Sequence, residues 1–345
     1  MANSPVTFLP LGALIQSFKI GDCNLVLGFP AQKDYDEHNS CYFGVTVGRV
    51  ANRIENATLT GIGGKTWTLD ANLDSHCLHG GSLGWSKRPW SGPFAVARTR
   101  IPGINHLANG RSVAYRLVSQ HGDQGFPGTV ETSVTYTTGT QAADDKGSGE
   151  VTVLAMELEA RLTDHADETV INMTNHSYFN LSGAPTIDGT VVILPTRNHL
   201  PVAQSSSIPT GQPPEPYAAL DTTQPFTMTP VGPRVDNCFT LAPDPAAVPI
   251  DTRSLPLALN LAAHHPDSGI HLEVLSTEPA FQFYTGDFVN VPSVNGAPPR
   301  GPRSGFCCEP GRFVNACNVP DWKSMTLLKK GDVYGARIVY RAWKD

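Results

Sequence analysis

Three short clusters of polar residues carry side chains that could do acid–base chemistry or hold a polar ligand. They read GRVANRI at 48–54, LHGG at 78–81 and TNHSYFNL at 174–181. Taken singly, each also has a structural interpretation: an arginine on a turn, a histidine at a glycine corner, or an Asn/His/Ser run that satisfies loop backbone groups. The clusters are therefore candidates for a functional site, and none of them defines a function alone.

Two other kinds of site find little support in the residue pattern. His76 and His79 are close together and His264 and His265 are adjacent, but the chain has no HExxH motif and no Cys/His quartet with intervals typical of zinc. A serine hydrolase is disfavoured because there is no GxSxG motif. We therefore expect no metal site.

The elements that must position these clusters are predicted to be strands. The 345 residues include 32 glycines and 29 prolines, which leave few windows long enough for a helix. Apolar residues alternate with period two in 113–117, 130–136 and 270–274, as half-buried strands do. The stretch 151–162 changes from apolar odd positions to apolar even positions, which predicts a β-bulge. Alternation in 337–341 predicts a closing strand.

The connections between these strands follow from turn-forming residues. Residues 6–20 are predicted to form a first strand and a turn. Residues 138–149, rich in Gly, Asp and Ala, are typical of a hairpin connection. Residues 195–233 hold nine prolines and are predicted to be long surface loops, because proline cannot serve a central ladder. With no internal repeat, we expect one domain over residues 1–345.

Composition excludes several classes of partner. Hydrophobic residues make up 40% of the chain and charged ones 16%, which suits a globular protein. A net charge of −6 without a Lys/Arg cluster gives no reason to bind nucleic acid or an anionic membrane. The apolar stretch 6–20 is too short and interrupted to span a bilayer. We expect no nucleic acid and no membrane partner.

The cysteines indicate the compartment. There are seven, an odd number without repeated CxxC spacing, in a chain large enough not to need disulfides. Free thiols in a reducing, cytoplasmic compartment fit this pattern. Cys307 and Cys308 are adjacent, so on a strand their side chains point to opposite faces, and we expect ordinary buried or wall positions.

The clusters also follow an order that is specific as a whole. They are followed by Asp236, by FQFYTG at 281–286 and by GFCCE at 305–309, with smaller matches at 125–128 and 200–202. This joint pattern, which spans nearly the whole chain, resembles the aldose 1-epimerase (mutarotase) family. The resemblance implies an all-β fold, a large antiparallel β-sandwich in a single domain, with an open sugar cleft on one sheet and no cofactor.

The resemblance also assigns roles. In the family, the histidine of the NHSYFNL motif is the general acid and the glutamate after the GF segment is the general base, positions held here by His176 and Glu309. Family positions that hold sugar hydroxyls correspond here to Asn52, Arg53, His79, Asp236 and Gln282. Tyr178 lies beside the acid and is expected to line the cleft. The implied partner is a small sugar, and the expected assembly is a monomer or weak dimer.

The implied reaction interconverts the α and β anomers of free hexoses such as galactose and glucose. A carboxylate removes the proton of the C1 hydroxyl while an acid protonates the ring oxygen, and the bond between C1 and the ring oxygen opens. The aldehyde rotates and the ring recloses from the other face. The reaction requires one group that can hold a proton near neutrality while the other stays ionised, and the ordinary pKa values of about 6.5 for histidine and about 4.3 for glutamate are near that requirement.

The chain departs from the family pattern after the base. Pro310, Gly311 and Arg312 stand where the family commonly has Thr-Gln or Pro-Gln, and 314–318 read VNACN where Pro-Asp-Ala-x-Asn is usual. We therefore expect a reshaped loop. Two alternatives stay open: an isomerase or cyclase of the same fold acting on a non-sugar hemiacetal or hydroxy-carbonyl compound, and a non-catalytic sugar-binding protein. Loss of the acid or the base would indicate the latter, and neither is lost.

Overall fold

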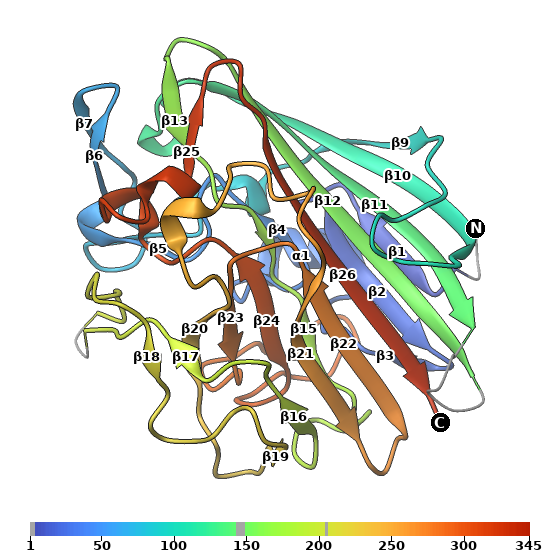
Figure 1. Ribbon diagram of the computed structural model, residues 1–345. Helices are drawn as coiled ribbons and strands as arrows, with labels where there is room; N and C mark the ends of the chain where they lie inside the picture. Colours follow the sequence, from blue (N-terminus) through green and yellow to red (C-terminus); the bar gives the residue numbers. More distant parts are fainter. Residues whose placement is uncertain (1–3, 143–148, 204–205) are drawn as a thin grey trace.

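Two large antiparallel sheets dominate the computed structural model, which describes residues 4–142, 149–203 and 206–345. The larger sheet has nine strands, and its long strands β10, β11, β12 and β26 run side by side in Figure 1. Its strand order is β19 (Phe226–Thr227), β16 (Val191–Ile193), β21 (Ala258–His265), β22 (Ile270–Ser276), β26 (Tyr334–Lys344), β12 (Glu150–Asp164), β11 (Thr129–Ala142), β10 (Ala108–Ser119) and β9 (Ser91–Val96).

The smaller sheet has six strands and carries half of the eight candidate site residues. Its order is β15 (Tyr178–Phe179), β24 (Phe306–Gly311), β23 (Ala280–Tyr284), β20 (Asp236–Thr240), β17 (Asn198–His199) and β18 (Glu215–Pro216). The two sheets pack face to face across an apolar core, where the ring of Phe179 meets that of Tyr340 edge to face at 5.0 Å. This confirms the predicted all-β sandwich.

Short elements complete the fold. The paired strands are β1 (Val6–Leu9) with β2 (Leu14–Ile20) and β3 (Cys23–Asn24), β4 (Thr46–Val47) with β14 (Thr174–Asn175), β5 (Arg53–Ile54) with β8 (Cys77–Leu78), β6 (Thr58–Ile62) with β7 (Lys65–Thr68), and β13 (Glu168–Val170) with β25 (Leu327–Lys329). The α-helix in the described residues is α1 (Gln32–His38), and single 3-10 turns occupy Glu55–Ala57, Trp85–Lys87, Asp123–Gly125, Pro245–Ala247, Ala316–Asn318 and Lys323–Met325.

The alternating stretches 113–117, 130–136 and 270–274 lie in β10, β11 and β22, as predicted. The predicted bulge within 151–162 is wrong, because β12 keeps an unbroken register there with both neighbours. The strand is instead covered on both faces. Its early odd positions enter one apolar cluster and its even positions from Leu154 onward enter the main core, so the pattern changes without an inserted residue.

Two predictions about connections need revision. Residues 6–20 form a hairpin of two strands, β1 and β2, rather than one strand and a turn. The proline-rich stretch 195–233 contributes β17, β18 and β19, but these two-residue strands lie at or next to sheet edges, where proline is tolerated. In the predicted hairpin connection 138–149, β11 continues to Ala142, and 143–148 lie outside the described residues.

Candidate active site

Period-two alternation on the smaller sheet separates a core face from a functional face. On β24, Phe306 and Cys308 join the main core, whereas Cys307 and Glu309 point to the other face. The same alternation on β23 buries Phe281 and Phe283 in the core and turns Gln282 and Tyr284 outward. The predicted opposite orientation of the two adjacent cysteines is confirmed.

The ladder register then aligns the functional side chains. Gln282 on β23 lies opposite Glu309 on β24, and Tyr284 lies opposite both Cys307 and, on β20, Asp236. Glu309, predicted to precede a reshaped loop, is followed by two residues that continue β24, so the strand does not end at the base. The departure from the family pattern at 310–311 therefore lies in a strand.

His176 comes from the segment between β14 and β15. Its backbone N–H donates to the carbonyl of Val45 at 2.9 Å, and its carbonyl accepts from Gly44 at 3.0 Å. Asn175 supports the same segment, since its side-chain amide donates to the Gly44 carbonyl and its oxygen accepts from the Ser177 N–H. These bonds explain why polar residues of the third cluster are buried, and they fix the imidazole above the sheet.

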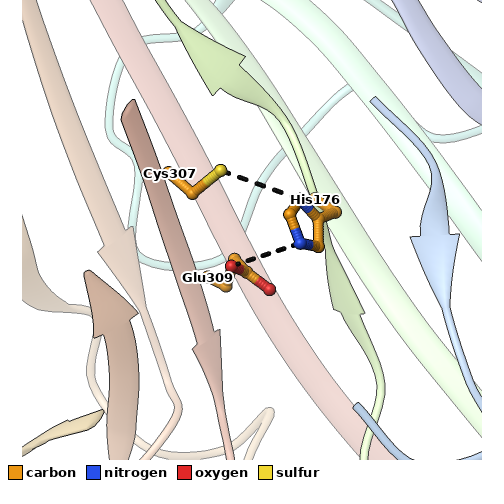
Figure 2. A group of neighbouring side chains, drawn as sticks. All are labelled: His176, Cys307 and Glu309. Carbon is orange, nitrogen blue, oxygen red and sulfur yellow. Dashed lines mark hydrogen bonds and ion pairs between the residues drawn. The ribbon is translucent and has the colours of Figure 1, made fainter. Parts of the chain in front are cut away.

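The imidazole of His176 lies between two side chains of β24, as Figure 2 shows. Its Nε2 is 3.5 Å from Oε1 of Glu309 and its Nδ1 is 3.7 Å from Sγ of Cys307. His176 is 5% exposed and Glu309 7% exposed, so both groups are largely shielded from water. The predicted acid and base are thus brought into direct contact across 133 residues of sequence.

Burial reverses the expected order of the two pKa values. Burial lowers the pKa of His176 to about 4. Burial, reinforced by the negative charge of Asp236 and opposed by Arg53, raises the pKa of Glu309 to about 8. Near neutrality the pair holds one proton, and these shifts place it on Glu309. The resting arrangement is therefore a neutral histidine beside a protonated glutamate, because both charged forms lose hydration when buried.

Asp236, Gln282 and Arg53 form a second connected group beside the pair. The Gln282 amide donates to Oδ1 of Asp236 at 2.7 Å, and the Arg53 guanidinium is 3.9 Å from Oδ2 of Asp236. The guanidinium also donates to the Asn52 side-chain oxygen at 3.1 Å. Oε1 of Gln282 is buried and has no protein donor, so it suits a hydroxyl donor from a ligand.

His79 joins the site from the second cluster. Its Nδ1 accepts a hydrogen bond from the Asn52 backbone N–H at 3.3 Å, and the backbone N–H of His79 donates to the Asn52 carbonyl at 2.9 Å. Burial holds the pKa of His79 well below its usual value, with the positive charges of nearby groups acting in the same direction. His79 is therefore neutral, and with Nδ1 accepting, the proton is left for Nε2 as a donor.

All eight predicted residues lie in one region, although their contributions differ. Tyr178 stacks on the His176 ring at 5.2 Å and is otherwise packed into the apolar wall. Arg49, in the first cluster, is structural: its guanidinium donates to the carbonyls of Pro127 and Gly128 and to Ser119. Some residues of the three clusters therefore form the site, and others, such as Arg49, stabilise the surrounding fold.

Two residues of the site were not predicted. Tyr42 places its ring 4.7 Å from His79 and 5.8 Å from His176, and no sequence motif marks it. Cys307 was expected only as a buried or wall residue, yet it contacts the imidazole; its position two residues before Glu309 was the available signal. A hollow of about 410 Å³ adjoins the site through Asp236 and Tyr284.

The arrangement is suited to proton transfer on a neutral, hydroxyl-rich ligand. The contact between His176 and Glu309 is short enough for a proton to pass between them, while amide, carboxylate and guanidinium groups offer donors and acceptors at fixed positions. Two of the histidines considered for a metal have other partners. His76 accepts from the Asn56 N–H, and His264 stacks on His271 on the larger sheet.

Comparison with known proteins places the sequence in a family. Residues 2–341 match the family described as aldose 1-epimerase, and the chain belongs to this family. The bifunctional protein GAL10 of Pachysolen tannophilus is 37% identical over 333 residues, which cover 96% of this chain and 44% of that protein. The galactose mutarotase of Sus scrofa is 33% identical over 346 residues, covering 95% of this chain and 88% of that protein.

The chain thus spans less than half the length of the bifunctional relatives it matches. Solved structures agree on the fold. The GalM/aldose epimerase homologue from C. elegans superposes with a TM-score of 0.77 at 24% identity, covering 98% of this chain and 95% of that one. Galactose 1-epimerase from Lactobacillus acidophilus gives a TM-score of 0.74 at 19% identity, covering 99% of this chain and 92% of that one.

In the described residues, we find no helix with the length and apolar character needed to cross a bilayer.

Proposed function

We propose that this chain is an aldose 1-epimerase that interconverts the α and β anomers of free hexoses such as galactose and glucose. The observation that carries the proposal is the contact between His176 Nε2 and Glu309 Oε1, inside a ring of sugar-compatible donors and acceptors. The family and its galactose mutarotase relatives support the same reaction.

In the proposed mechanism, Glu309 is the base and His176 the acid. Ring opening moves the C1 hydroxyl proton to Glu309 and the His176 proton to the ring oxygen, which leaves a protonated glutamate and a neutral histidine. This is the arrangement that burial favours, so the site stabilises the proton positions of the open-chain intermediate. Before the reaction, a proton must pass from Glu309 to His176 across their 3.5 Å contact.

Sugar binding assists that preparatory transfer. A C1 hydroxyl that donates to Glu309 stabilises its ionised form, because hydrogen bonds to a carboxylate lower its pKa. Arg53 acts in the same direction. We assign the binding of the other hydroxyls to Asn52, Arg53, His79, Asp236 and Gln282, and a place in the cleft wall to Tyr178.

The remaining expectations stand as part of the same proposal. The protein is cytoplasmic, a monomer or weak dimer, folded as one domain over 1–345, and takes a small sugar as its partner. Seven free thiols support a reducing compartment. The alternative of a non-sugar substrate rested on the altered residues after Glu309, and the first two of these continue β24.

Polarimetry of freshly dissolved α-D-galactose and α-D-glucose tests the proposal. The wild type should speed the relaxation of optical rotation well beyond buffer, and Glu309→Gln should abolish the effect. Glu131→Gln, an exposed glutamate on β11, is the matched control and should keep wild-type activity. A wild type no faster than buffer with both sugars would overturn the assignment.

A further inference from the structure

Three side chains of different ligand types converge at the proposed catalytic centre. His176, Cys307 and Glu309 each offer one ligand atom, and these atoms lie within 4.8 Å of one another. Figure 2 shows the imidazole facing both the thiol and the carboxylate. Among residues 4–142, 149–203 and 206–345, this is the one group of three or more such residues with that geometry.

The donor set selects a class of ion. Zn²⁺ and similar thiophilic divalent ions accept sulfur, imidazole nitrogen and carboxylate oxygen together, whereas Mg²⁺ and Ca²⁺ require shells built mainly of oxygen. Zinc–ligand bonds of about 2.0–2.3 Å in a tetrahedron put the ligand atoms roughly 3.3–3.6 Å apart. The Cys307 and Glu309 contacts with His176 are already 3.7 and 3.5 Å.

These two contacts use different nitrogens of the imidazole, so a metal that takes one nitrogen requires the ring to turn. The remaining separations all lie within 4.8 Å, so they must shorten by at most about 1.5 Å, a movement within the range of side-chain rotation. Three protein ligands leave a fourth tetrahedral position for water or a hydroxyl. The position of the site on β24 and on the hydrogen-bonded 175–177 segment keeps the ligands' backbones fixed.

We propose that Zn²⁺ binds to Cys307 Sγ, one nitrogen of His176 and a carboxylate oxygen of Glu309, and inhibits the enzyme by occupying its acid and base. Binding releases the thiol proton of Cys307 and any proton on Glu309 to solvent, and the ion's two positive charges balance the thiolate and carboxylate. Metal binding itself does not depend on the proposed function; only the inhibition rests on it.

The neighbouring cysteine provides a matched control. Cys308 is buried in the main core on the opposite face of β24 and cannot reach His176. A metal bound by the proposed triad therefore requires Cys307 and not Cys308. Co²⁺ serves as the spectroscopic probe, since a thiolate ligand gives it a near-ultraviolet charge-transfer band.

The test titrates tag-free, chelator-treated protein with Co²⁺ and then with Zn²⁺. We expect one Co²⁺ per chain with a thiolate band in wild type and Cys308→Ala, loss of the band in Cys307→Ser, and displacement by Zn²⁺. Circular dichroism checks that each variant is folded. No band in the wild type, or an equal band in Cys307→Ser, would overturn the proposal.

Polarimetry separates this outcome from the proposed function. Zn²⁺ at ten times its dissociation constant should lower the mutarotation rate about tenfold at low sugar concentration, with recovery on adding EDTA. An active enzyme without the Co²⁺ band would refute the metal site and leave the epimerase assignment intact. A Co²⁺ band in a protein without mutarotase activity would support the metal site and refute the epimerase assignment.

Discussion

At the scale of single residues, the central feature is the one proton shared by His176 and Glu309. Neither side chain titrates independently, because they touch and are both buried. The proposed mechanism requires that His176 and Glu309 together hold one proton, whichever of the two residues carries it. The pH dependence should therefore report the loss of that single-proton state.

The first prediction concerns the pH profile of kcat/KM, measured by polarimetry in buffer containing a chelator. A plateau is expected between two limbs. Near pH 4, His176 becomes protonated while Glu309 is already protonated, and near pH 8, Glu309 loses its proton while His176 is neutral. A single limb near pH 6.5, the ordinary value for histidine, would contradict the account.

A second prediction links the same shift to stability. Glu309 is protonated in the folded state up to about pH 8, but in the unfolded chain its pKa returns to the ordinary value of 4.5. Its stabilising effect is complete below pH 4.5 and is lost as pH rises through 8, at about 1.4 kcal/mol per pH unit in that window. The gain in free energy of unfolding from Glu309→Gln should therefore grow between pH 5 and 8.

Urea unfolding at several pH values measures this gain, with Glu131→Gln as the control for an exposed glutamate. A difference between Glu309→Gln and wild type that does not change with pH would show that the carboxyl has an ordinary pKa. Residue types alone could not predict this shift, since the reversal of the two pKa values comes from burial, which depends on the whole fold.

At the scale of elements, β24 shows what a sequence pattern can and cannot predict. Alternation correctly predicted that Cys307 and Cys308 face opposite sides. It could not predict that β24 pairs with β15 and β23, because such ladders join segments far apart in the chain. Alternation also led to a wrong prediction for β12. Both faces of this strand are covered, so its apolar residues change from odd to even positions without a β-bulge.

A third prediction concerns the end of β24, where the sequence departs from the family. Arg312 is fully buried and its Nη1 is 2.9 Å from Oε2 of Glu278, also fully buried. Arg312→Met leaves the carboxyl without its partner and should cost about 3–5 kcal/mol of unfolding free energy. The double variant with Glu278→Leu should recover much of that loss; a single variant as stable as wild type would contradict the structural role of the pair.

At the scale of the whole molecule, one core joins both large sheets. It contains residues from Val6 to Ala342, including Phe281 and Phe283 from the smaller sheet and Met156 and Tyr340 from the larger. The sequence pattern predicted the fold class, while the resemblance to a family was needed to predict which distant residues meet. Tyr42 could not be predicted as a site residue because it belongs to no motif of that resemblance.

This shared core gives a fourth prediction, about the expected single domain. Chemical unfolding followed by far-ultraviolet circular dichroism and by tryptophan fluorescence should give coincident transitions, because neither sheet can keep its apolar face covered alone. Two separate transitions would divide the chain into independent units.

The most direct test of the central claim compares His176→Ala and Glu309→Gln for mutarotation and for galactose binding. If these residues transfer the protons, kcat should fall about 10²- to 10⁴-fold in each, while ligand-observed NMR still detects galactose bound with affinity within a few-fold of wild type. Wild-type mutarotation rates in both variants would contradict the account.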